Sequence, residues 1–189
     1  MNTPRVFLDA CVLFPPLVRT ILLGTAPDRF QPLWSQRVLD EWRIAIARKS
    51  GPDAERKVLE AIIAMTEAYP DALLPPNPAL ETQIHLPDPA DAHVVAAASG
   101  AADIVLTFNL RDFPRSALAA HALTPRDPDG FLWELLSEDA EIIPPLQKIF
   151  RDFDLQTDTR RALKRARLPR FGKAWDAAVT SDSQNPAKG

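Results

Sequence analysis

The chain has 189 residues, a net charge of −3 and 46% apolar residues, values expected for a soluble globular protein and not for a uniformly basic nucleic-acid binder. No apolar run approaches the about 18 residues of a membrane span, and the first apolar run already carries Asp9, so neither a span nor a signal peptide is expected. The single cysteine, Cys11, excludes an intramolecular disulfide and fits a cytoplasmic protein.

The charge is unevenly distributed along the chain. Residues 148–173 contain nine basic residues and three acids, a net charge of +6, whereas residues 1–147 carry −8. A basic segment of this kind is either the solvated face of a helix or a surface that follows phosphate groups. Surface charge alone does not decide between the two.

Strand and helix signals alternate along the chain. Strands are expected over residues 6–9, 33–35, 72–74, 104–108 and 122–124. Helices are expected over residues 15–26, 36–49, 52–69, 89–99, 129–136, 142–153, 157–167 and 175–179. Ser35 and Asp88 are predicted N-caps, Gly100 is a predicted C-cap, and the proline-rich residues 70–90 are interpreted as a connection.

This alternation is typical of an α/β fold, and the buried run at residues 6–9 is interpreted as a strand of a parallel sheet. A basic helical extension over residues 138–180 and a disordered tail over 181–189 are expected to follow.

Asp9 is the strongest candidate for a functional residue. It closes the buried run Val6-Phe7-Leu8, and ligands of parallel sheets bind outside the carboxyl ends of the strands. Asn109 ends a later buried run and would emerge at the same edge, with Asp112 three residues on. Clustered oxygen ligands suit a hard cation such as Mg²⁺ or Mn²⁺.

Each polar residue also has a structural interpretation. Asp9 and Asn109 are also turn formers, and Glu41 at the border of its helix face can be an ordinary exposed glutamate. Asp88 is a strong N-cap, and Asp91 can complement a helix dipole. The spacing between the three histidines, His85, His93 and His121, is not that of metal ligands. His93 is expected to pack in the protein or to face solvent. Cys11 is interpreted as a small buried hydrophobe.

Four segments together resemble the PIN domain family, over about residues 4–137. They are Val6-Phe7-Leu8-Asp9-Ala10, Glu41-Trp42, the run from Asp88-Pro89-Ala90-Asp91 to Ala98, and the run from Ile104 to Asn109-Leu110-Arg111-Asp112-Phe113-Pro114. The resemblance is closest to the VapC-like branch, the toxins of toxin–antitoxin pairs. It implies a three-layer α/β/α sandwich with a central parallel sheet over residues 1–137, and a Mg²⁺- or Mn²⁺-dependent ribonuclease.

The resemblance also implies roles for individual residues. Asp9, Glu41 and Asp91 match the family's acids, with Asp9 and Asp91 as metal ligands, while Asn109 stands where many relatives have a fourth acid. Asp112 is the next acid in the sequence that could supply the carboxylate that Asn109 lacks. Asp88 and Thr107 are secondary candidates for the site, and the Thr107 hydroxyl is expected to point at it. The candidates for substrate binding are Arg111, Arg115 and residues 148–173.

The resulting hypothesis is an endoribonuclease toxin that leaves 5′-phosphate and 3′-hydroxyl ends, with RNA as substrate and an antitoxin protein as partner. Phe30, Trp34 and Trp42 are predicted to be exposed, for contact with the antitoxin or in a homodimer. The alternatives are a catalytically silent nucleic-acid- or protein-binding scaffold, a DNA-directed nuclease, and a phosphoacceptor module, for which no lysine stands at a strand end.

Overall fold

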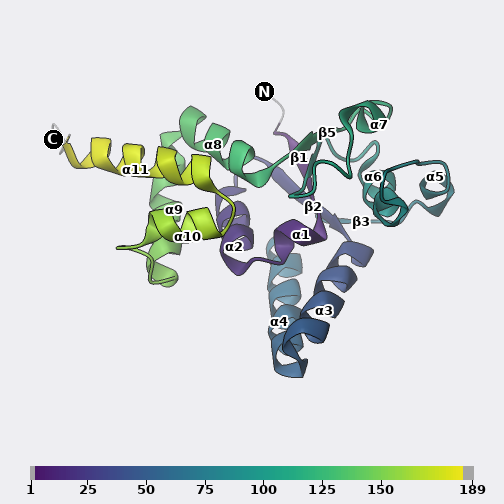
Figure 1. The fold of residues 1–189 in the computed structure, drawn as a ribbon, viewed down its shortest axis with the longest axis horizontal. Helices are drawn as coiled ribbons and strands as arrows, with labels where there is room; N and C mark the ends of the chain where they lie inside the picture. Colours follow the sequence, from purple (N-terminus) through teal and green to yellow (C-terminus); the bar gives the residue numbers. More distant parts are fainter. Residues whose placement is uncertain (1–2, 185–189) are drawn as a thin grey trace.

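Five parallel strands form the centre of the protein, with helices on both faces (Figure 1), in a computed structural model that describes residues 3–184. The strand order is β3-β2-β1-β4-β5. The strands are β1 (Arg5–Leu8), β2 (Gln31–Ser35), β3 (Leu73–Leu74), β4 (Ile104–Leu106) and β5 (Thr124–Arg126). The predicted three-layer α/β/α class with a parallel sheet is therefore confirmed.

The strands are joined by helices, of which α2, α3, α4 and the η1–α6 pair begin within a residue of their predicted starts, whereas α1, α5 and α7 were not predicted. These helices are α1 (Ala10–Leu13), α2 (Pro16–Thr25), α3 (Gln36–Ser50), α4 (Pro52–Ala68), α5 (Pro78–Glu81), the 3₁₀ helix η1 (Pro89–Asp91), α6 (Ala92–Ala98) and α7 (Arg115–Ala119). The Ser35 hydroxyl caps α3 by accepting a hydrogen bond from the backbone N–H of Val38. Every residue of α6 is buried, because its mostly small side chains let the helix lie close to the sheet.

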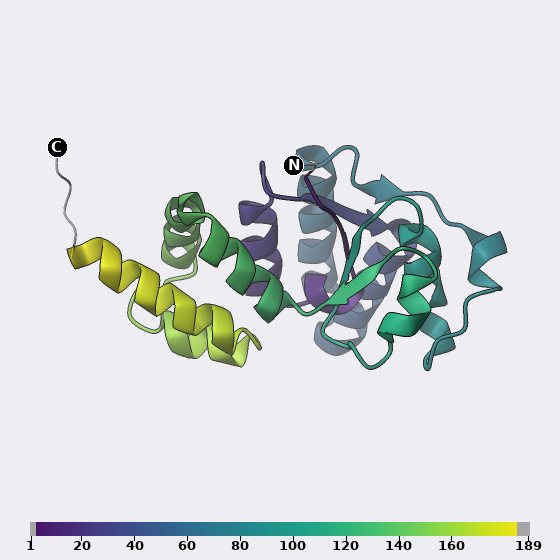
Figure 2. The same ribbon diagram turned by 90° about the horizontal axis from the view of Figure 1, so that it is seen from above.

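The C-terminal helices lie together at one end of the molecule, opposite α5 and α6 (Figures 1 and 2). They are α8 (Pro128–Glu138), the 3₁₀ helix η2 (Ala140–Ile142), α9 (Ile143–Asp152), α10 (Thr159–Arg165) and α11 (Pro169–Gln184). They pack through α9 on α2 and through α11 on α8, and the rings of Phe150 and Trp175 meet edge to face at 4.8 Å. The expected domain boundary at residue 137 falls inside α8, and the division into domains stays a prediction.

Several elements differ from the sequence-based expectation. A short helix, α5, interrupts the proline-rich connection, because Asn77 caps it and Pro78 occupies its first position. The helix α7 lies in residues for which no element was predicted, and β5 begins at Thr124, where the expected strand ends. The last helix is much longer than expected: α11 runs to Gln184, so the start of the expected tail is helical, and residues 185–189 lie outside the described residues.

The prediction that Phe30, Trp34 and Trp42 are exposed is wrong. All three are at most 2% exposed and belong to the core. The Phe30 ring packs edge to face against Phe131, and Trp34 packs against Tyr69 in the same way. Large aromatic side chains bury more apolar area than their neighbours, which favours the core over an exposed helix face. Within residues 3–184, no helix is long and apolar enough to cross a membrane.

The carboxyl ends of the strands form one edge of the sheet, because all strand pairs are parallel. The N–H of Asp9 donates to the carbonyl of Leu106 at 3.1 Å, and the N–H of Thr107 donates to the carbonyl of Arg126 at 3.0 Å. Asp9 and Thr107 therefore extend neighbouring strands by one residue at this edge. Since β4 ends at Leu106 and not at Phe108, Thr107 and not Asn109 follows the strand directly, which corrects the predicted position of Asn109.

Candidate functional site

Asp9 is buried at the carboxyl edge, with 6% of its surface exposed. It occupies the N-cap position of α1, yet its side chain makes no capping hydrogen bond. Instead its Oδ2 accepts hydrogen bonds from the Thr107 hydroxyl at 2.7 Å and from the Cys11 thiol at 2.9 Å. Among the described residues, Oδ1 has no side-chain donor, so one oxygen of this carboxylate is held in place and the other is free to bind a ligand.

Cys11 is a hydrogen-bonding member of the site, which corrects its interpretation as a small hydrophobe. Its Sγ donates to Asp9 and accepts from the backbone N–H of Phe108 at 3.2 Å. Burial and the negative charge of Asp9 raise the pKa of the Cys11 thiol to about 12. The thiol therefore stays protonated at neutral pH and orients Asp9, whereas a nucleophilic cysteine needs a thiolate.

Asp91 is the second free carboxylate of this edge. It stands at the N-cap position of α6 without a side-chain capping bond, whereas Asp88 does cap η1 by accepting from the N–H of Ala90 at 2.9 Å. Burial raises the pKa of Asp91 to about 6, together with the charges of Asp9, Asp88 and Asp112. The pKa rises because neighbouring like charges and the loss of water both disfavour the ionised form.

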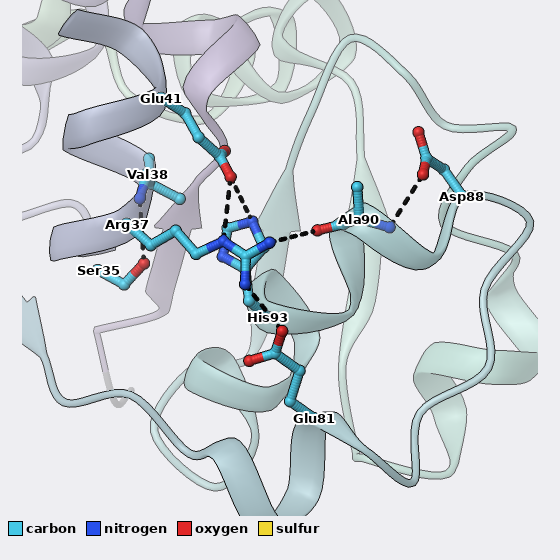
Figure 3. Close-up of polar contacts among 8 residues, drawn as sticks. All are labelled: Ser35, Arg37, Val38, Glu41, Glu81, Asp88, Ala90 and His93. Carbon is cyan, nitrogen blue, oxygen red and sulfur yellow. Dashed lines mark hydrogen bonds and ion pairs between the residues drawn. The ribbon is translucent and has the colours of Figure 1, made fainter. Parts of the chain in front are cut away.

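Glu41 of α3 points toward His93 and Arg37 (Figure 3). Its Oε1 is 2.9 Å from Nε2 of His93 and 3.3 Å from Nε of Arg37. Burial acts to raise the pKa of Glu41, but His93 and Arg37 outweigh it, and the net pKa is lowered. Glu41 is therefore ionised at neutral pH and already paired.

His93 and Arg37 were not predicted as site residues. His93 is 5% exposed. Its Nε2 lies at ion-pair distance from Glu41 but is not aligned for a hydrogen bond. Its Nδ1 has no hydrogen-bond partner within residues 3–184. Arg37 also donates to Glu81 at 2.8 Å and to the carbonyl of Ala90 at 3.3 Å (Figure 3). The sequence does contain a signal for both residues, since Arg37 precedes Glu41 by one helical turn and His93 follows Asp91 by two residues.

The remaining predicted residues lie in the loop after β4 and beyond it. Asn109 is exposed, and its backbone N–H donates to the Thr107 hydroxyl at 3.0 Å. Asp112 is near enough to raise the pKa of Asp91, and the exposed Arg111 lies 3.8 Å from it. Arg115 lines a separate cavity of about 560 Å³ with Arg126 and Arg170.

The chemistry of the donors fits a divalent metal ion. Burial and the charges of Asp9, Asp88 and Asp112 raise the pKa of Asp91 more than His93 lowers it, and a bound cation would act to lower this pKa. In the described part of the chain, no three acidic, histidine or cysteine side chains are grouped closely enough to ligate one ion. Mg²⁺ nevertheless needs only one or two carboxylates, because it keeps several of its water ligands. Asp9 and Asp91 meet this requirement.

A parallel sheet with free aspartates at its carboxyl edge defines a class of α/β proteins with a candidate metal site. The sequence profile of the PIN domain family matches residues 5–111, and the chain belongs to this family. Proteins of the family are typically divalent-metal-dependent nucleases, which places the chain in a nuclease-like class of hydrolases. No curated protein and no solved structure matches the chain. The match ends before Asp112, so α7 to α11 lie outside it.

Proposed function

We propose that the protein is a Mg²⁺- or Mn²⁺-dependent endoribonuclease of the VapC-like branch, and the toxin of a type II toxin–antitoxin pair. The observation that carries the nuclease proposal is the cluster of Asp9 and Asp91, both without side-chain capping bonds at helix N-cap positions, with Asp88 and Asp112 near enough to act on Asp91. Such a cluster costs stability unless a cation neutralises it, and it stands at the edge where parallel sheets bind their ligands.

Asp9 and Asp91 would hold the metal ion. A bound divalent ion polarises the scissile phosphate and lowers the pKa of a water molecule. Thr107 and Cys11 restrict Asp9 to one orientation through Oδ2, which keeps the free Oδ1 directed for binding. In-line attack by water and departure of the 3′ oxygen would leave 5′-phosphate and 3′-hydroxyl ends.

Glu41 has a supporting role in this proposal. Its lowered pKa makes it a weak proton acceptor at neutral pH, so it is better suited to orienting water or RNA by accepting hydrogen bonds. Asn109 and Asp112 border the same edge, and the side chain of Asp112 is 21% exposed, which leaves it accessible to a water ligand of the ion.

The key experiment substitutes Asp9→Asn and measures RNA cleavage, with sequencing of product ends. We expect cleavage to be abolished while circular dichroism and the melting temperature stay close to those of the unmodified protein, because the amide keeps the size of the carboxylate. Asp53→Asn is the matched control, since the Asp53 side chain is 89% exposed on α4. Full activity of the Asp9→Asn variant would refute the site.

Metal titration separates the nuclease from a catalytically silent scaffold. Calorimetry of the unmodified protein with Mg²⁺ and Mn²⁺ should show binding that Asp9→Asn removes, whereas a scaffold would show none near Asp9. The phosphoacceptor alternative lacks support, because the recorded side-chain partners of Asp9 in the described chain are Thr107 and Cys11, with no lysine.

The toxin role and its partners rest on the resemblance to the VapC-like branch. A cytoplasmic toxin should arrest growth when induced, and the arrest should require Asp9. Co-expression with the protein encoded beside it should relieve the arrest, and size-exclusion chromatography should show that complex or a homodimer. Growth arrest by the Asp9→Asn variant would separate toxicity from cleavage and contradict the proposal.

A further inference from the structure

The C-terminal helices reach the loop that follows β4 through one residue, Arg167. Its Nη2 donates to the carbonyl of Phe108 at 3.1 Å, and its guanidinium lies 4.5 Å from the centre of the Phe108 ring. Phe108 stands between Thr107, which holds Asp9, and Asn109. A residue outside the part of the chain that matches the PIN family thus contacts Phe108, the residue directly after Thr107.

A second arginine repeats this arrangement. The guanidinium of Arg170 lies 4.8 Å from the centre of the Trp133 ring on α8. Stacking on an aromatic face fixes the plane of a guanidinium and leaves the N–H groups at its edge free to bind a phosphate. Within the described chain, the Arg170 guanidinium has no acidic partner, and Arg167 uses a single recorded donor bond.

The backbone that carries both arginines is fixed by a buried acid. Asp129 on α8 is 7% exposed and accepts hydrogen bonds from the N–H groups of Arg170 at 3.0 Å and Phe171 at 2.8 Å. Leu168 and Phe171 beside them are fully buried. The start of α11 is therefore anchored to α8, and the arginines are held in place before any ligand binds.

The structure also separates these two arginines from other basic residues of the 148–173 segment. Lys148, Arg160 and Arg165 form ion pairs with Asp152, Asp176 and Asp158 inside the C-terminal helices. Arg161 and Lys164 line a cavity of about 690 Å³ between α10 and α11. The segment is thus not one uniform basic face.

Arg170 shares the cavity of about 560 Å³ at the end of β5 with Arg115 and Arg126. Arg126 is neutralised by Glu134 at 2.6 Å, and Asp127 caps α8 through the N–H of Gly130. Arg115 has no recorded acidic partner among the described residues. Two cations with free donors, Arg115 and Arg170, therefore face one polar hollow beside the sheet edge.

We propose that Arg167, Arg170 and Arg115 form the surface that binds the RNA backbone on the β5 side of the acidic edge, so that the C-terminal helices are part of the substrate site. The proposal rests on RNA being the substrate in the proposed function. Carboxylates at the edge repel phosphates, and cations beside them are required to hold the strand. The two arginine–aromatic stacks supply preorganised N–H donors that can bind the phosphates of the RNA strand.

The test measures binding of a short labelled single-stranded RNA by fluorescence anisotropy over a range of salt, in the full chain with Asp9→Asn to prevent cleavage. Arg115→Gln, Arg167→Gln and Arg170→Gln should each weaken binding about fivefold or more and reduce the slope of log K against log salt by about 0.7. Arg161→Gln and Arg56→Gln remove exposed arginines elsewhere and should change binding by less than about twofold.

A purely structural role of the arginines gives a different result. In that case Arg167→Gln lowers the melting temperature and leaves the salt slope unchanged, which would overturn the proposal. Arg167→Lys should restore the salt slope but only part of the affinity, because lysine keeps the charge and loses the stacked fork. Should Arg167→Gln fail to fold, Arg115→Gln on the short helix α7 carries the test.

Two outcomes distinguish this proposal from the nuclease proposal. If the unmodified protein cleaves RNA and the three arginine variants match the controls in KM and salt slope, the binding surface is refuted and the nuclease stands. If the unmodified protein does not cleave RNA but binding depends on the three arginines, the surface is supported and the nuclease is refuted.

Discussion

The two sides of the carboxyl edge differ in how their acids are compensated. On the β1 and β4 side, Asp91 is surrounded by Asp9, Asp88 and Asp112, and its pKa is raised to about 6. On the α3 side, Glu41 is paired with His93 and Arg37, and its pKa is lowered. The pKa values of two chemically similar side chains are therefore shifted in opposite directions, although His93 acts to lower both, because Asp91 is close to other carboxylates and Glu41 is also paired with Arg37.

The predicted acids therefore differ in whether their carboxylate oxygens are free or already paired. Asp9 and Asp91 have free carboxylate oxygens at helix N-cap positions that they do not use for capping. Glu41 instead joins α3 to α6 through His93, and Arg37 continues this network to Glu81 of α5 and to Ala90 of η1 (Figure 3). Three predictions test whether this division is real.

The largest expected effect is on cleavage. Asp91→Asn should reduce kcat for RNA cleavage by at least about a hundredfold, whereas Glu41→Gln should reduce it by about tenfold to a hundredfold, because supporting groups around a metal site contribute less than its ligands. Glu60→Gln, an exposed glutamate on α4, is the control for the second change. Equal losses for Asp91→Asn and Glu41→Gln in a single-turnover assay would remove the distinction between the two sides.

The second prediction concerns metal binding as a function of pH. The metal-free Asp91 carboxyl holds its proton below about pH 6, and a metal ion must displace it. The apparent affinity for Mg²⁺ should therefore fall by up to about tenfold for each pH unit below about 6 and level off above about 7. Calorimetric titrations over this range measure it, and an affinity that does not change through pH 6 would contradict the placement of Asp91 as a ligand.

The smallest effect is on stability, and it should have opposite signs on the two sides. Because the folded pKa of Asp91 lies above its unfolded value of 3.8, its contribution to stability is present below pH 3.8 and is lost as the pH rises through about 6. Without metal at pH 8, Asp91→Asn should therefore stabilise the fold, by about 1 kcal/mol after allowance for the half-exposed position.

Glu41→Gln should instead destabilise the protein, by about 0.5–1 kcal/mol, because Glu41 has a lowered pKa and its pairing contributes stability above its unfolded pKa. Urea unfolding of both variants in a chelating buffer measures the two changes. Destabilisation by both substitutions would show that Asp91 is not under electrostatic strain in the metal-free protein.

Much of the fold follows from local sequence signals. The run Val6-Phe7-Leu8 specifies a buried strand, Ser35 starts α3, and the small residues of α6 specify close packing on the sheet. These signals act through neighbouring residues, so they can be recognised in the sequence. The short helices α1, α5 and α7 were missed, since a helix of four or five residues has almost no periodicity.

The sequence by itself determined that Asp9 ends a buried strand and that Asp91 stands in the first turn of a helix, because strand and cap patterns are local. Only the tertiary structure decided which cations reach each acid. Arg37 and His93 contact Glu41, Cys11 and Thr107 donate hydrogen bonds to Asp9, and Arg167, from between α10 and α11, donates to the carbonyl of Phe108. Electrostatic compensation depends on separations of a few ångströms between residues far apart in the chain, and spacing along the sequence does not encode these separations.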